Sequence, residues 1–197
     1  MYERSDEAIR LLNKRTAQRF RQTEAKLSKA KFDELNVISE VRTLYGALAA
    51  DNDEVLLDLA RQQYEGVTPH GAALPDAAWL AALLLAYDPV TKYVYRHEVE
   101  RKRDRTAEAV NSVTAKFAQM DIAARYWSDM TAQYCDTVVD EATVKAYKDA
   151  GVTRVRWVTQ ADERVCEKCR KRHGKVYPID DLPPKAHWRC RCYVVPA

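Results

Sequence analysis

The sequence predicts a mostly helical α+β protein, in which a long-helix bundle (residues 1–150) precedes a small β module (residues 151–197). Two observations carry this prediction. Residues 1–68 contain only two glycines, Gly46 and Gly66, and no proline, and strong helix formers predominate there. After Gly151, β-formers alternate with polar residues, and four of the five cysteines lie in this last segment. We therefore expect two units that meet near residue 150.

The first helix is predicted from Ser5 to about Lys31. A serine cap followed by two acidic residues suits a helix N-terminus, where the macrodipole favours negative charge. The apolar positions of this segment are sparse, namely Ile9, Leu12, Phe20 and Leu27. A stripe this thin buries little surface, so we expect the helix to pack against a partner or to project from the body.

The next helices follow from apolar residues at steps of three and four. Residues 35–48 form one such face, and Asp51 or Asp53 is expected to cap a further helix that extends to about Tyr64. Gly66–Leu74 predicts a loop. Asp76 then opens a short apolar helix that ends at Asp88-Pro89, because the residue before proline disfavours helical geometry. The apolar residues of this short helix are Trp79, Leu80, Leu83, Leu84 and Tyr87.

A long helix is predicted from Val90 toward Met120, and helical spacing continues to Tyr134. Val94, Val110, Val113 and Phe117 are expected to face inward, and Ile122 continues the same spacing. A last helix, from about Asp140 to Ala150, is expected to stop at Gly151, as helices commonly do at glycine. Three strands are predicted after it, at 153–159, 175–177 and 192–195.

Charge is unevenly distributed along the chain. The net charge is +3, but residues 1–31 carry +5, residues 32–160 carry −6 and residues 161–197 carry +4. Both basic ends suit phosphate or an acidic protein surface, although solvated helix faces explain the first segment equally well. The longest apolar stretch, Ala77–Tyr87, is far shorter than the roughly 20 residues of a membrane span. With no secretory pattern at the start, we expect a soluble protein kept in a reducing cytoplasm.

The cysteines of the β module predict a structural zinc site. Cys166 and Cys169 form a Cys-x-x-Cys turn, which points two thiolates at one centre, and Cys190 and Cys192 supply a second pair. In a reducing compartment such an arrangement indicates metal rather than a disulfide. A module this small also needs a bound metal or a cross-link, because its apolar core alone supplies little stability. We expect one zinc ion per chain.

Five residues compete for the four positions around zinc. Cys166, Cys169, His187 and Cys190 are favoured, and Cys192 is a close rival for the place of His187. His173 lies in a basic run, Arg170–His173, that indicates an exposed loop. So many thiolates predict a closed site without an open catalytic position.

The remaining candidate residues have structural interpretations. Asp162 is expected to cap the turn that presents Cys166 rather than to act as a base, and Cys135 is expected in a helical core. His70 and His97 have no partner in spacing. A redox dithiol at Cys166 and Cys169 would require a thioredoxin-like βαβ unit, which the sequence does not indicate.

The C-terminal residues resemble the phage Mu F-like family of minor head, or head morphogenesis, proteins of tailed phages. The resemblance rests on a Trp-containing strand, Asp-x-x-x-Cys-x-x-Cys, a Gly-containing turn and a Pro-x-His-x-x-Cys-Arg-Cys ending, here Trp157, Asp162, Cys166, Cys169, Gly174, His187, Cys190 and Cys192. It implies a structural virion protein, made in the bacterial host cytoplasm and located in the capsid interior or portal/neck region. The implied partners are the portal protein, the major capsid or scaffold proteins, and packaged DNA through non-specific contacts.

Two further function classes stay open at the level of sequence. A zinc-stabilised nucleic-acid-binding module would contact phosphates through basic residues around the metal, namely Arg170, Lys171, Arg172, Lys175, Arg189 and Arg191. A zinc hydrolase or nuclease would need an open metal position and a base, and neither is indicated. A non-enzymatic head protein is the favoured prediction.

Overall fold

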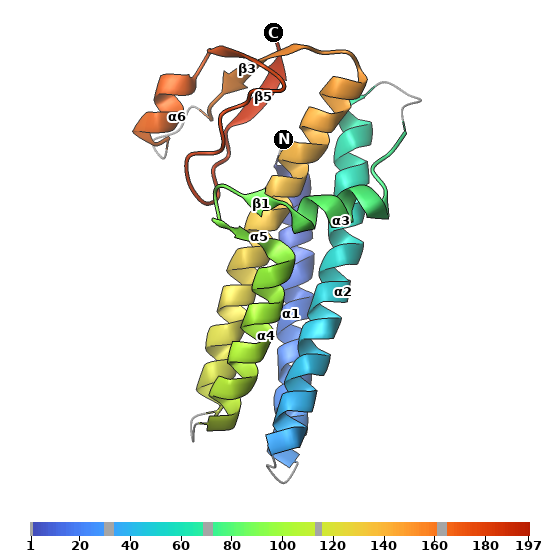
Figure 1. Ribbon diagram of the computed structural model, residues 1–197, viewed down its shortest axis with the longest axis vertical. Coiled ribbons are helices and arrows are strands. Elements are labelled where there is room, and N and C mark those ends of the chain that lie inside the picture. Colours follow the sequence, from blue (N-terminus) through green and yellow to red (C-terminus); the bar gives the residue numbers. More distant parts are fainter. Residues whose placement is uncertain (1, 30–33, 69–72, 113–115, 161–164) are drawn as a thin grey trace.

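The computed structural model describes residues 2–29, 34–68, 73–112, 116–160 and 165–197. Four long helices run side by side and form the body of the molecule (Figure 1). They are α1 (Glu3–Lys29), α2 (Glu34–Val67), α4 (Tyr95–Ser112) and α5 (Lys116–Asp149). A short helix, α3 (Ala77–Leu85), lies across this bundle, and Asp76 caps it by accepting the backbone N–H of Trp79. None of the helices described is both long enough and apolar enough to cross a membrane.

A small three-stranded sheet follows the bundle. β3 (Arg154–Val158) is the central strand, and β4 (Val176–Pro178) and β5 (Tyr193–Pro196) pair with it antiparallel on either side. Helix α6 (Glu167–Arg172) lies between β3 and β4 in the sequence. Figure 1 shows this sheet and α6 at the end of the bundle where the N-terminus also lies. The predicted α+β, mostly α fold is thus confirmed, and the three predicted strands are present.

Each part has its own set of buried apolar residues. The bundle core contains Leu12, Leu56, Tyr95 and Trp127, all at most 1% exposed. The second cluster lies under the sheet and consists of Val155, Trp157, Cys169, Ile179, Cys190, Cys192 and Val194. Gly151, between α5 and β3, has a φ of 76°, which glycine adopts without strain at a helix end. Whether residues 1–150 and 151–197 fold independently stays a prediction.

Two predicted helix breaks are wrong. α2 continues through Asp51 and Asp53, because both carboxylates are held by arginines rather than used as caps: Asp51 pairs with Arg19 at 3.0 Å and Asp53 with Arg96 at 2.7 Å. α5 likewise runs unbroken, so no separate helix begins at Asp140. Neither region contains a proline to interrupt the helical hydrogen bonds.

The segment before α4 also differs from the prediction. Residues 87–94 form a hairpin of β1 (Tyr87–Asp88) and β2 (Tyr93–Val94) instead of continuing two helices. Asp88 explains this turn, because its Oδ1 accepts the backbone N–H groups of Val90 and Thr91 and competes with helix formation. Tyr87, predicted as one of the apolar residues of the short helix, lies outside that helix and is 62% exposed.

Several predicted burial assignments change as well. α1 packs against α2 and α5 of its own chain, so it neither projects nor needs a partner for burial. Thr16 and Thr23 are buried between Leu12, Phe20 and Leu27 and complete the stripe that the apolar residues alone leave thin. Phe117 is exposed, contrary to prediction, and Ile122, which continues the helical spacing, is exposed as well. Val113 lies outside the described residues.

Candidate metal centre

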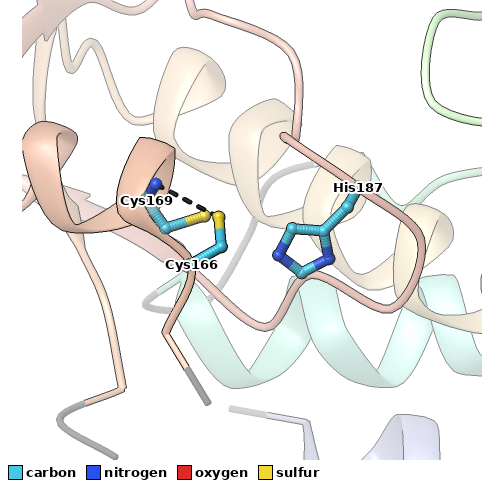
Figure 2. Close-up of side chains that lie close together, drawn as sticks. All are labelled: Cys166, Cys169 and His187. Carbon is cyan, nitrogen blue, oxygen red and sulfur yellow. Dashed lines mark hydrogen bonds between the residues drawn. The ribbon is translucent and has the colours of Figure 1, made fainter. Parts of the chain in front are cut away.

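The predicted metal ligands converge from two segments of the C-terminal module. Cys166 immediately precedes α6 and Cys169 lies in its first turn, while the other three precede β5. The donor atoms of Cys166, Cys169 and His187 lie within 4.8 Å of one another, and Figure 2 shows these side chains close together. The sulfurs of Cys169, Cys190 and Cys192 meet the same limit. Because Cys169 belongs to both groups, the five candidates form one continuous cluster.

Helix α6 explains how the first cysteine pair is presented. Cys166 occupies the N-cap position, and its Sγ accepts the backbone N–H of Cys169 at 3.4 Å (Figure 2). The basic run predicted as a loop is therefore helical up to Arg172, which corrects the sequence interpretation. His173 follows the helix, and its Nδ1 accepts the backbone N–H of Thr159 at 3.1 Å. His173 thus contacts the end of β3 and is not part of either donor group.

The thiols of the cluster differ in how readily they ionise. A hydrogen bond from Cys192 lowers the pKa of Cys190 to about 4, whereas burial raises the pKa of Cys169 to about 12. The Cys169 backbone N–H lowers the pKa of Cys166, and the adjacent Cys190 thiolate is the main reason why the pKa of Cys192 is raised. The Cys190–Cys192 pair therefore holds one proton and one negative charge. A divalent cation bound by the cluster would displace the protons of its thiol ligands and compensate the charge of the thiolates.

The donor set fits a thiolate-ligated zinc ion. Zn–S bonds of about 2.3 Å in a tetrahedron place neighbouring sulfurs about 3.8 Å apart. The sulfurs of Cys169 and Cys190 are 3.5 Å apart, which is close to that spacing. All five cysteines are free of disulfides, and among the residues that the structure describes no carboxylate joins the sulfur-rich cluster. Soft thiolate donors favour zinc over magnesium or calcium.

Two arginines beside the cysteines are engaged by the bundle. Arg189 pairs with Asp136 of α5 at 3.0 Å, and Arg191 pairs with Asp6 of α1 at 2.6 Å. The nucleic-acid-binding hypothesis assigns both arginines to phosphate contacts. In the structure, carboxylates of the bundle neutralise their charges instead. The segment that carries these candidate ligands is thereby fixed to α1 and α5. No sequence pattern indicated this, since the partners lie far apart in the chain.

Tyr2 and Lys185 are the other residues that sequence reasoning missed. The Tyr2 hydroxyl lies 2.7 Å from Asp140 Oδ1 and 2.9 Å from the carbonyl oxygen of Cys192. Lys185 Nζ donates to that hydroxyl at 2.8 Å and also pairs with Asp140 at 2.9 Å. The backbone of Cys192, a candidate metal ligand, thus belongs to the same hydrogen-bond network as Tyr2.

The other residues considered from sequence do not join the cluster. Cys135 is fully buried on α5, as predicted for a core residue. His97 lies exposed on α4. Asp162 and His70 lie outside the described residues.

Comparison with known protein families identifies the class to which this protein belongs. Residues 91–195 match the family described as Phage Mu protein F like protein, which covers more than half of the chain. The chain belongs to this family and is a phage head morphogenesis protein of the virion. The match includes α4 and α5, so the relationship reaches beyond the cysteine module on which the sequence resemblance rested. Searches of curated proteins and of solved structures find no match.

Proposed function

We propose that this chain is a non-enzymatic minor head protein that associates with the portal inside the head and acts in procapsid assembly or in DNA packaging and ejection. The family match over residues 91–195 carries the proposal, because it includes α4 and α5 of the bundle together with the cysteine module. The major capsid and scaffold proteins are further partners in this proposal. The protein's location would be the capsid interior or the portal/neck region.

The metal has a structural role in this proposal. We propose that Cys166, Cys169, His187 and Cys190 hold one zinc ion per chain, with Cys192 as the alternative to His187. Cys169 and Cys190 are at most 3% exposed, and the module has only a small apolar core of its own. A closed, thiolate-rich zinc joins α6 to the segment before β5 and supplies folding free energy that so small a core lacks.

Quantitative mass spectrometry of purified virions and procapsids tests the assembly role. We expect a few copies of this chain per particle, counted against the major capsid and portal proteins. Procapsids made without portal should lack the chain if it docks there. Absence from both virions and procapsids would overturn the proposal.

One observation favours a second function, binding of nucleic acid by the zinc module. Lys168, Arg170 and Lys175 are exposed near α6, and no ion pair holds them among the described residues. Arg189 and Arg191 contribute less, because they are paired with carboxylates. Binding to double-stranded DNA should then weaken steeply with salt, with a logarithmic slope of about 0.9 for each phosphate contacted. A slope near zero would exclude this function.

A further inference from the structure

A groove lies between the bundle and the C-terminal module, apart from the cysteine cluster. Its volume is about 450 Å³, within the range of roughly 300–1,000 Å³ that is usual for binding pockets. The β1–β2 hairpin and the end of α3 form one wall, and α5 forms the floor. The other wall consists of Trp157 and the segment Leu182–Lys185.

The groove is largely apolar, and most of the charge that lines it is negative. Asp88, Asp140 and Glu141 line it together with a single cation, Lys185. Lys185 is already paired with Asp140 at 2.9 Å, and no cation of the described residues forms an ion pair with Asp88 or Glu141. The groove therefore has an excess of negative charge within apolar walls.

Asp88 is the clearest sign that this surface lacks a partner. The residue is only 8% exposed, and its Oδ2 has no hydrogen-bond partner among the residues that the structure describes, while Oδ1 holds the hairpin turn. A buried carboxylate oxygen without a partner is costly. Partial desolvation and the nearby Asp88 carboxylate raise the pKa of Glu141, which indicates that the two acids interact. At the rim, the ring of Tyr87 is 62% exposed.

We propose that this groove binds an extended segment of a partner protein in which one lysine or arginine, flanked by aliphatic residues, places its cation between Asp88 and Glu141. The cation supplies the missing partner of Asp88, and the aliphatic side chains cover Tyr87, Trp157 and Leu182. Charge complementarity selects this occupant, because an acidic segment would add like charge to a desolvated site. The inference rests on the proposed function only in taking the partner to be another head component.

Peptide titration of the full-length, metal-loaded chain tests the proposal. The probes are the blocked tripeptides Leu-Arg-Leu and Leu-Glu-Leu. The reporter is the indole N–H signal of Trp157, a residue that lines the groove and whose buried Nε1 has no hydrogen-bond partner among the described residues. We expect saturable shifts with the arginine peptide and binding at least about tenfold weaker with the glutamate peptide. No saturation by the arginine peptide up to about 5 mM, or equal binding of the two peptides, would overturn the proposal.

Charge variants identify the side chains responsible. Asp88→Asn keeps the turn acceptor and removes the charge, so we expect about tenfold weaker binding of the arginine peptide. Glu141 is exposed, so Glu141→Gln should not disturb folding and tests the proposal even if Asp88→Asn does. We expect it to weaken binding of the arginine peptide about threefold. Asp58→Asn, exposed on α2 outside the groove, is the matched control and should leave binding unchanged. Unchanged binding in the Glu141 variant, or equal weakening in the control, would contradict the assignment.

The binding proposal for the groove and the proposed function can be disproved independently. Loss of peptide selectivity would remove the binding site while the copy number in virions still establishes a head protein. Absence from particles together with selective peptide binding would keep the site and redirect the search to a partner outside the head.

Discussion

The hydroxyl of Tyr2 lies 2.9 Å from the carbonyl oxygen of Cys192, although 190 positions separate the two residues. Asp140 and Lys185 contact the same hydroxyl, so α1, α5 and the segment before β5 meet at this point. Ion pairs of Asp6 with Arg191 and of Asp136 with Arg189 surround it. The start of the chain thereby stabilises the segment that carries three of the five metal-ligand candidates.

Replacing Tyr2 with phenylalanine should lower the free energy of unfolding by about 1 kcal/mol. The ring remains buried, so the loss reflects the hydrogen bonds to Asp140 and Cys192. Urea denaturation measures the change. Tyr87→Phe is the matched control, because that ring is 62% exposed, and it should change stability by less than about 0.5 kcal/mol. Equal effects of the two substitutions would show that the Tyr2 network contributes no stability.

Metal removal should unfold the small sheet and leave the helices. The apolar cluster under the sheet is separate from that of the bundle and includes Cys169, Cys190 and Cys192. Purified under reducing conditions without chelator, the chain should contain about one zinc. Chelation, or Cys169→Ser, should abolish the tertiary signal of Trp157 while most of the helical circular dichroism remains.

Cys135→Ala supplies the control for that experiment. This cysteine is buried on α5 outside the cluster, so its substitution should change bundle stability but not the zinc content. A metal-free protein with an intact sheet would contradict the structural role of zinc. Loss of the whole helical signal in one step would show that the two parts form a single folding unit.

The sequence predicts the metal cluster better than its surroundings, for a physical reason. Cys-x-x-Cys spacing is local, and a helix start such as that at Cys166 is enough to bring its two sulfurs together. The strands are also predicted, because alternation is a local pattern. The contact of Tyr2 with Cys192 has no local signal, since a single tyrosine near a helix start is compatible with many environments.

Some helix boundaries also depend on long-range contacts that no local sequence pattern indicates. Asp51 and Asp53 have the residue type of helix caps, but arginines from α1 and α4 hold them in mid-helix. The short apolar helix is predicted to end at Asp88-Pro89 but ends at Leu85, and the hairpin after it depends on tertiary pairing of Tyr87 with Val94. Local propensity therefore gave the helical content, and long-range ion pairs decided where the helices continue.

The fourth zinc ligand can be decided by comparing two substitutions. His187 lies beside Cys166 on the exposed side of the centre, whereas Cys192 lies beside Cys190 on the buried side. With Cys166, Cys169, His187 and Cys190 as ligands, His187→Ala should lower cobalt affinity at least about tenfold and Cys192→Ser should change it little. Thiolate-to-cobalt charge-transfer absorption measures both. The reverse ranking would assign the fourth position to Cys192.

Asp140 should titrate with a raised pKa of about 6, chiefly because burial disfavours its charged form, while Lys185 opposes the shift. The ordinary value is 3.8, so the folded state holds this proton more tightly than the unfolded state. Its contribution to stability is therefore complete below pH 3.8 and is lost as the pH rises to about 6. Carbon-detected NMR titration of the aspartate carboxyls measures the midpoint directly. Lys185→Met should raise it further, whereas Lys145→Met, which removes the partner of Asp149 on the same helix, should not. A midpoint near 3.8 in the unsubstituted protein would mean that the Asp140 carboxylate is solvated, and that the network joining Tyr2, Lys185 and Cys192 is open to water.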